Sequence, residues 1–192
     1  MKVAVIGSGA SGLVAIKSCI DEGLEPVCFE REDNIGGLWY FTEDDRDKGS
    51  VYRSTVINTS KEMMCYSDFP IPKEFPPFMH NSKVLEYFHL YANHFDLYKY
   101  IRFHTQVTDI RQAKDYSVTG NWELTYVRPD SPDREEQKEI YNAVMVCIGH
   151  HASPSWPRFR GMEEFSGIKM HSHSYKDFKE FEGKRILIIG KL

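Results

Sequence analysis

Residues 3–12 read Val-Ala-Val-Ile-Gly-Ser-Gly-Ala-Ser-Gly, and the fold of the chain can be worked out from this stretch. Four apolar residues in a row predict a short buried strand. Gly7, Gly9 and Gly12 then follow with the spacing G-x-G-x-x-G. In such a loop the first glycine permits a tight turn, the second lets the backbone approach a pyrophosphate, and the third lets the next helix pack against the strand. The stretch therefore predicts a dinucleotide-binding unit.

A predicted helix and a second predicted strand complete this unit. The helix is expected over residues 10–22 and the strand over 26–30. The N–H groups at the start of the helix would face the phosphates. An acidic residue at the end of the second strand is placed to accept hydrogen bonds from a ribose 2′-OH, and it repels a 2′-phosphate. Glu30 therefore predicts NAD or the ADP half of FAD rather than NADP.

The remaining pattern predicts an α/β fold around a mainly parallel sheet. A helix is expected to run to about His94, with Asn81 or Ser82 as its N-terminal cap. Further strands are expected over residues 101–110, 121–128 and 139–149. Residues 143–149 are apolar on both faces, which is typical of a strand inside a sheet.

Composition excludes several classes of protein. The chain has 192 residues and a net charge of -4, which does not suit a nucleic-acid-binding surface. No apolar run approaches the ~20 residues that cross a bilayer, and the first residues lack a signal peptide, so this chain by itself is expected to be cytoplasmic. Cys19, Cys28, Cys65 and Cys147 have no tight spacing and are expected to be reduced thiols.

The last ten residues, Gly-Lys-Arg-Ile-Leu-Ile-Ile-Gly-Lys-Leu over 183–192, predict a buried strand that runs into a tight turn. A second nucleotide-binding unit would begin in this way, but the glycine loop and helix that should follow are not in the sequence. We therefore expect two parts: residues 1–150 as a dinucleotide-binding domain, and residues 151–192 as a linker with the first strand of a truncated second domain.

Several motifs, in this order, resemble those of the vertebrate-type flavin-containing monooxygenases (dimethylaniline monooxygenases). They are GSGASG (7–12), CFERED (28–33), IGGLW (35–39), INTSKEMMCYSDFP (57–70), AVMVCIGHH (143–151) and FSGIKMHSHSY (165–175). The resemblance covers essentially the whole chain. It implies a Rossmann-like FAD-binding fold, with a smaller antiparallel insertion beside the parallel sheet, and a second domain for NADPH.

The resemblance also implies roles for individual residues. Asn58 would be the active-site asparagine near the reactive edge of the flavin. The implied cofactor-binding residues are Gly7, Ser8, Gly9, Ala10, Ser11, Gly12, Glu30, Leu38, Trp39, Ile57, Asn58 and Thr59. Among them, the glycine loop would hold the FAD pyrophosphate, Glu30 the adenosine ribose, and Leu38 with Trp39 the flavin. Ile57 and Asn58 would also face the nicotinamide nucleotide.

The implied activity is an NADPH-using monooxygenation. Reduced FAD would take up dioxygen as a C4a-hydroperoxide, which oxygenates nitrogen- or sulfur-containing xenobiotics, or ketones. The family's location would be the cytosolic face of the endoplasmic reticulum membrane, although this chain contains no anchor. Because the NADPH loop is missing, the alternative is an FAD-binding fragment without catalytic activity.

Other interpretations rest on single residues. His171 and His173 could share one face of a strand, but no third metal ligand is suggested, so no metal site is predicted. A disulfide reductase would need a redox-active cysteine pair, and the spacing of Cys19 and Cys28 does not suit one. Lys61 is interpreted as a member of an ion pair or of a solvated face.

Overall fold

The computed structural model describes residues 1–43, 48–130, 135–150 and 152–190. Its elements, in chain order, are β1 (Lys2–Ile6), α1 (Ala10–Asp21), β2 (Glu25–Phe29), η1 (Gly37–Trp39), α2 (Lys61–Met64), α3 (Asn81–His94), η2 (Tyr98–Tyr100), β3 (Ile101–Arg102), β4 (Gln106–Gln112), α4 (Tyr116–Thr119), β5 (Trp122–Val127), β6 (Gln137–Tyr141), β7 (Ala143–Val146), η3 (Ser172–Ser174) and η4 (Lys179–Phe181).

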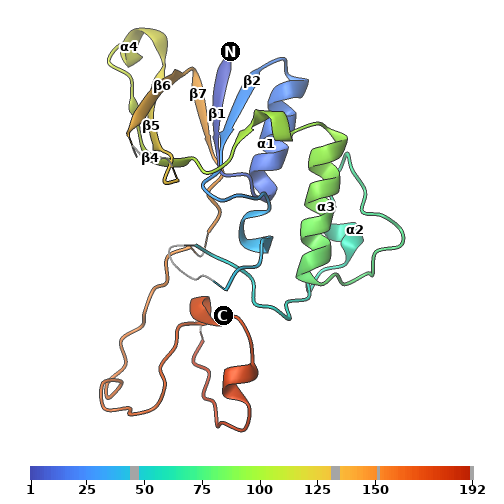
Figure 1. The fold of residues 1–192 in the computed structure, drawn as a ribbon, viewed down its shortest axis with the longest axis vertical. Coiled ribbons are helices and arrows are strands. Elements are labelled where there is room, and N and C mark those ends of the chain that lie inside the picture. The colour runs from blue at the N-terminus through green and yellow to red at the C-terminus, as the bar shows by residue number, and fades with distance from the viewer. Residues whose placement is uncertain (44–47, 131–134, 151, 191–192) are drawn as a thin grey trace.

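The parallel sheet has the strand order β3-β2-β1-β7 (Figure 1). In β1, Val3 pairs with Pro26 of β2 on one side and with Ala143 of β7 on the other. Residues 3–6 of β1 are buried, as expected for a strand whose two faces are both covered. The sheet and its crossover helix confirm the predicted α/β fold.

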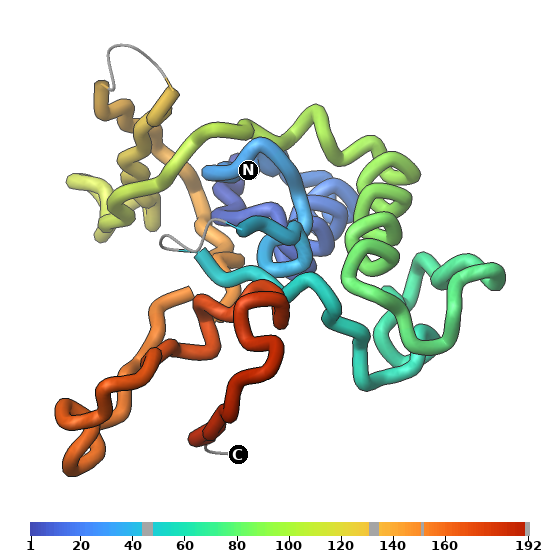
Figure 2. The backbone as a smooth tube through the Cα atoms, turned by 60° about the horizontal axis from the view of Figure 1, so that its bottom comes forward, coloured from blue at the N-terminus to red at the C-terminus, as the bar shows by residue number. Residues whose placement is uncertain are grey.

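Two helices cover one face of this sheet. Helix α1 connects β1 to β2, and Figures 1 and 2 both show α3 beside it. Ile16 of α1 and Tyr91 of α3 are fully buried in one core with Val5 of β1. Burying apolar surface between helices and sheet is the main favourable contribution to this packing. The core thereby fixes the position of the first turn of α1, which begins the candidate site.

The antiparallel sheet has the order β4-β5-β6 and lies on the other side of β1 and β2. Aromatic rings join the two sheets, because Phe29 of β2 lies 5.1 Å from the ring of Tyr126 and 5.8 Å from that of Tyr141. This sheet is the smaller antiparallel insertion that the resemblance implies.

Two predicted strands are each divided in the structure. The predicted strand 101–110 is two strands, because His104 has a φ of 49° and turns the chain from β3 into β4. The predicted strand 139–149 is also two, with β6 in the antiparallel sheet and β7 in the parallel one. A continuous run of strand-forming residues does not reveal where a chain passes from one sheet to another.

Two expected buried strands are not buried. β7 pairs with β1 alone among the described strands, and Val146 is 63% exposed. Residues 184–190 have no regular secondary structure, and Ile188 is 87% exposed. A strand needs a neighbouring strand to satisfy its backbone polar groups, and no described strand pairs with this segment. The prediction of a buried strand there was wrong for this structure.

A charged cluster ties the antiparallel sheet to the parallel one. Glu139 of β6 accepts hydrogen bonds from Arg102 (2.6 Å), Tyr126 (2.7 Å) and Tyr141 (2.6 Å), and its carboxylate lies 3.2 Å from the Lys2 ammonium. Burial alone would raise the pKa of Glu139, but these donors together lower it from 4.5 to about 2. The ionised carboxylate is therefore the form that stabilises the fold.

This pKa gives the fold a predictable acid dependence. Because the folded-state pKa of Glu139 is the lower one, its contribution is complete above the unfolded-state value and is lost as the pH falls from 4.5 toward 2. We expect Glu139→Gln to lower the free energy of unfolding by about 2 kcal/mol at pH 7. Near pH 2, where the folded-state carboxylate is largely protonated, the loss should be much smaller. Urea denaturation at both pH values measures this.

Glu123→Gln on the neighbouring strand β5 is the matched control, since the Glu123 carboxylate forms an ion pair with Lys138, at 3.4 Å, on the exposed face of the sheet. Its effect should be small at both pH values, as is usual for a lone pair at the surface. A pH-independent loss of stability in Glu139→Gln would contradict the account.

Candidate functional site

The loop after β1 adopts a conformation that only glycine tolerates at its first position. Gly7 has a φ of 96°, and its N–H donates to the Phe29 carbonyl at 2.8 Å. A Cβ at Gly7 would lie 2.7 Å from the carbonyl oxygen of Cys147. The loop is thus wedged between the ends of β2 and β7, at the carboxyl edge of the sheet, where open α/β sheets bind ligands.

The third glycine lets α1 begin directly against this loop. A Cβ at Gly12 would lie 1.9 Å from the carbonyl oxygen of Gly7, which leaves no room for any side chain. Gly9, between them, is different. Its φ is -73°, and a Cβ there would make ordinary contact with the Cα (3.6 Å) and the N (3.7 Å) of Gly37, so no described residue requires glycine at this position.

The N-terminus of α1 is open to an anion. Gly9 is its N-cap, no side chain caps the helix, and its first turn contains no acidic residue. The first N–H groups of a helix and its dipole together attract a phosphate. A dinucleotide pyrophosphate fits this arrangement, because Gly9 presents backbone without a side chain at the same point. The residues present therefore suit the predicted cofactor.

Glu30 is buried, at 6% exposed, and it organises the loop. One carboxylate oxygen accepts from the Ser8 N–H at 2.8 Å and from the Ser8 hydroxyl at 2.7 Å, and the other accepts from the Glu32 N–H at 3.0 Å. A carboxylate has about four acceptor sites, so capacity remains for a further hydroxyl. The ribose contact of Glu30 was predicted from the sequence, and its hydrogen bonds to Ser8 are an additional role that was not.

A second glycine turn packs on the first. The Gly36 N–H donates to the Ser8 carbonyl at 3.1 Å. Gly36 and Gly37 have φ values of 106° and 55°, and a Cβ at Gly37 would lie 3.3 Å from the Cα of Gly9. The short helix η1 then begins at Gly37 and brings Leu38 and Trp39 next to the loop.

The segment that contains Asn58 contacts the candidate site through other residues of the segment and not through Asn58 itself. Asn58 and Thr59 are exposed, and the preceding Ile57 is buried, with its N–H donating to the Met79 carbonyl at 2.9 Å. Further along this segment, the Tyr66 hydroxyl donates to the carbonyl of Ala10, in the first turn of α1, at 2.8 Å. Burial raises the pKa of Tyr66, so this donor stays protonated.

The structure thus joins some predicted site residues by direct contacts and not others. Residues 7–12, Glu30 and residues 36–39 form one contiguous cluster. Among the contacts of the described residues, none joins Asn58 or Thr59 to that cluster directly, and Tyr66 supplies the link. The catalytic role of Asn58 stays a prediction.

The sequence did not reveal the structural roles of Lys61 and Asn81. Lys61 is only 9% exposed, and its ammonium donates to the carbonyls of Pro72 (3.1 Å), Lys73 (2.8 Å) and Phe75 (2.7 Å), so the interpretation as an ion pair or solvated face was wrong. Asn81 begins α3 but does not cap it, because the side chain of the preceding His80 accepts from the Ser82 N–H. No local sequence pattern marks either residue.

The cysteines support the expectation of reduced thiols. All four are free, and Cys28 beside the glycine loop is fully buried. Burial raises the pKa of the Cys28 thiol well above its ordinary value, with Glu30 and Cys147 acting in the same direction. Such a thiol is a poor nucleophile.

Among the described helices, none is both long enough and apolar enough to cross a membrane.

A first crossover unit with a glycine loop at the carboxyl edge of the sheet defines a dinucleotide-binding α/β protein. The particular family follows from a comparison with known families: the flavin-binding monooxygenase-like family matches residues 1–191, and the chain belongs to it.

Individual relatives agree with this assignment. The chain is 54% identical to dimethylaniline monooxygenase [N-oxide-forming] 2 of Cavia porcellus, over 98% of this chain and 35% of that protein. It therefore spans about a third of the length of the curated relatives it matches.

Solved structures share the fold. S-allyl-L-cysteine S-oxygenase from Allium sativum matches with a TM-score of 0.84 and 28% identity, over 94% of this chain and 43% of that one. An oxidized steroid monooxygenase bound to NADP matches with a TM-score of 0.64 and 25% identity, over 86% of this chain and 29% of that one.

Proposed function

We propose that this chain is the FAD-binding part of an NADPH-dependent monooxygenase. The observation that carries the proposal is the glycine loop at the open N-terminus of α1, with Glu30 buried behind it. Gly7 to Gly12 would hold the FAD pyrophosphate, and Glu30 the adenosine ribose. Residues 1–150 would form this domain, and residues 151–192 a linker to an NADPH-binding domain.

Other residues would shape the reactive end of the site. Leu38 and Trp39 would lie against the flavin and exclude water, and Thr59 would contact it. Bound FAD would supply the redox chemistry that brings electrons from NADPH to dioxygen. Asn58 would orient groups at the reacting edge, because its amide can donate through Nδ2 and accept through Oδ1 without releasing a proton. Ile57 would face the nicotinamide nucleotide beside it.

The names of the relatives support a substrate class. One is an N-oxide-forming dimethylaniline monooxygenase, and a solved neighbour is an S-oxygenase of S-allyl-L-cysteine. We therefore propose small molecules with a nucleophilic nitrogen or sulfur, or ketones, as substrates together with dioxygen, and a role in xenobiotic metabolism. The whole protein would act at the cytosolic face of the endoplasmic reticulum membrane.

A second candidate is an FAD-binding fragment that does not catalyse. In this candidate the glycine loop and Glu30 would hold FAD without any oxidation of NADPH. The two candidates differ in one measurement, which is NADPH consumption in air by the FAD-loaded chain. Consumption above the rate of free FAD supports the enzyme, and no consumption supports the fragment.

Selectivity for the adenosine half tests the binding proposal. We expect FAD to bind at least tenfold more tightly than FMN, equivalent to about 1.4 kcal/mol, because the loop and Glu30 would contact the part that FMN lacks. Glu30→Gln should weaken FAD binding, since an amide nitrogen cannot accept from the ribose or from Ser8. Quenching of flavin fluorescence measures both affinities.

Glu32→Gln is the matched control, because the Glu32 side chain pairs with Lys48 at 2.8 Å and not with the loop. It should bind FAD like the unmodified chain. Equal affinities for FAD and FMN, or unaltered binding by Glu30→Gln, would disprove the proposed arrangement.

A further inference from the structure

The backbone that leads to Asn58 is held by the N-terminus of α3. The Asn81 side chain, in a residue only 4% exposed, donates to the carbonyls of Tyr52 (3.3 Å), Arg53 (3.0 Å) and Thr55 (3.4 Å). The backbone N–H of Asn81 also donates to the Thr55 carbonyl, at 2.9 Å. With the bridge between Val56 and His80, the segment is held at almost every residue up to Asn58.

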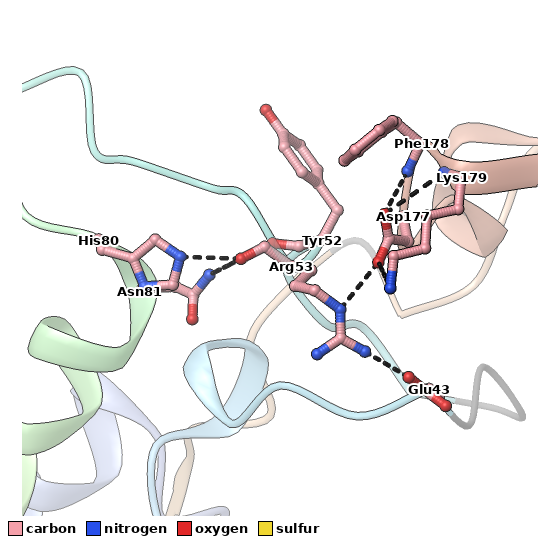
Figure 3. Close-up of polar contacts among 8 residues, drawn as sticks. All are labelled: Glu43, Tyr52, Arg53, His80, Asn81, Asp177, Phe178 and Lys179. Carbon is pink, nitrogen blue, oxygen red and sulfur yellow. Dashed lines mark hydrogen bonds and ion pairs between the residues drawn. The ribbon is translucent and has the colours of Figure 1, made fainter. Parts of the chain in front are cut away.

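His80 adds a second donor to the same point. Its Nε2 lies 2.9 Å from the carbonyl oxygen of Arg53, and because a carbonyl can only accept, Nε2 carries the proton. The other ring nitrogen, Nδ1, is then free to accept from the Ser82 N–H at 3.3 Å. The Arg53 carbonyl thus receives hydrogen bonds from both His80 and Asn81, as Figure 3 shows.

The other groups of Arg53 hold a distant part of the chain. Its N–H donates to the Lys176 carbonyl at 2.8 Å, and its Nε donates to Oδ2 of Asp177 at 2.9 Å. Its second guanidinium nitrogen pairs with Glu43 (Figure 3). Figure 2 shows how the C-terminal segment returns to this part of the chain after it has left the sheet.

Asp177 is itself fixed by the turn that it begins. Its Oδ1 accepts from the Phe178 N–H at 2.7 Å and from the Lys179 N–H at 3.4 Å, at the start of η4. Oδ1 therefore orders residues 177–179, and Oδ2 accepts from Arg53 and lies 3.9 Å from the Lys179 ammonium. Figure 3 shows these two sets of bonds on opposite sides of the carboxylate.

We propose that Arg53 is a positioning residue that couples residues 175–179 to the loop carrying Asn58. Its carbonyl is fixed to His80 and Asn81 at the start of α3, and its N–H and side chain are fixed to Lys176 and Asp177, so a displacement of residues 175–179 is transmitted to the segment that leads to Asn58. The coupling stands on these contacts alone, and its consequence for chemistry rests on the proposed function. Movement of the proposed NADPH-binding domain would then change the position of Asn58.

The ion pair between Arg53 and Asp177 is expected to position the two segments and to add little to the free energy of unfolding. The side chain of Arg53 is 49% exposed and that of Asp177 is 21% exposed. Exposed ion pairs contribute little to the stability of a fold. Removing this pair should therefore leave the melting temperature almost unchanged while it breaks the side-chain link between residues 53 and 177.

The sharpest test uses Asp177→Asn and Arg53→Met in the isotope-labelled 192-residue chain. Asparagine keeps an Oδ1 that accepts from residues 178 and 179 but removes the acceptor for Arg53, and methionine keeps the backbone contacts of residue 53. We expect the backbone and side-chain amide resonances of Asn58 to shift by more than a linewidth in both variants. The control Asp96→Asn removes an exposed pair with Lys99, at a residue whose positive φ of 52° suits asparagine, and should leave Asn58 unshifted.

FAD titration separates this inference from the proposed function. If both hold, both variants should bind FAD about fivefold more weakly, at the lower end of ordinary coupling between sites. If Asn58 shifts in both variants and the unmodified chain binds no FAD, the coupling stands and the proposed function fails. Unshifted Asn58 resonances in either variant would overturn the coupling, whatever the affinity for FAD.

Discussion

Gly12→Ala is expected to destabilise the chain by about 3 kcal/mol or more, whereas Gly9→Ala is expected to keep the fold and lose dinucleotide binding. At Gly12 an added methyl would lie 1.9 Å from the backbone oxygen of Gly7, so the start of α1 must move away from β1. Overpacking of this kind costs ~1–3 kcal/mol even where side chains can yield, and a backbone carbonyl yields less.

At Gly9 the same methyl meets only ordinary contact, 3.6 Å from the Cα of Gly37. The backbone there already has a φ that alanine adopts, and the fold should lose only about 1 kcal/mol for the poorer N-cap. The methyl would instead fill the space that a pyrophosphate needs, so FAD affinity should fall at least tenfold, or ~1.4 kcal/mol.

Urea denaturation and flavin fluorescence titration on both variants check this pair. The two glycines lie in one loop and receive the same chemical change, so each serves as the other's control. An unfolded Gly9→Ala variant, or a Gly12→Ala variant as stable as the unmodified chain, would show that the loop is packed differently.

Lys61→Met is the second large effect, with an expected loss of about 3 kcal/mol in the free energy of unfolding. The ammonium of Lys61 donates hydrogen bonds to the carbonyls of Pro72, Lys73 and Phe75 and closes the loop that runs from α2 to α3. Hydrogen bonds to charged groups contribute ~1.5–3 kcal/mol each, and buried carbonyls left without a donor cost more than lost contacts alone. Methionine is an unbranched side chain only one atom shorter than lysine, but it donates nothing.

Lys73→Met is the control for Lys61→Met, because Lys73 lies in the same loop with an exposed side chain. Its effect on stability should be within ~0.5 kcal/mol, as for most surface substitutions. Thermal unfolding followed by circular dichroism measures both, and about 3 kcal/mol corresponds to ~10 °C in a chain of this size. Similar melting temperatures for the two variants would show that the carbonyls are satisfied in another way.

The first unit was predictable because its local patterns and its tertiary structure agree. Residues 3–12 specify strand, turn and helix at once, and the structure places β1 and α1 within a residue or two of the predicted bounds. The glycine spacing also revealed the loop geometry, because Gly7 and Gly12 are positions where backbone packing excludes a side chain. Local steric requirements of this kind are visible in a sequence.

Other features depend on partners that are remote in sequence. The apolar runs within residues 143–149 and at 186–189 predicted buried strands. Burial depends on a neighbouring strand, however, and β7 has only β1 beside it among the described strands. Lys61 and Asn81 look like surface residues because lysine and asparagine usually are. Only the folded chain shows that each donates to three backbone carbonyls.

The most direct test of the account is a visible absorption spectrum of the chain after incubation with FAD and desalting, with Gly9→Ala treated in parallel. The account predicts that the unmodified chain retains a flavin spectrum and that folded Gly9→Ala does not. A folded but colourless unmodified chain, or equal retention by both, would contradict the claim that the loop at the N-terminus of α1 binds the FAD pyrophosphate.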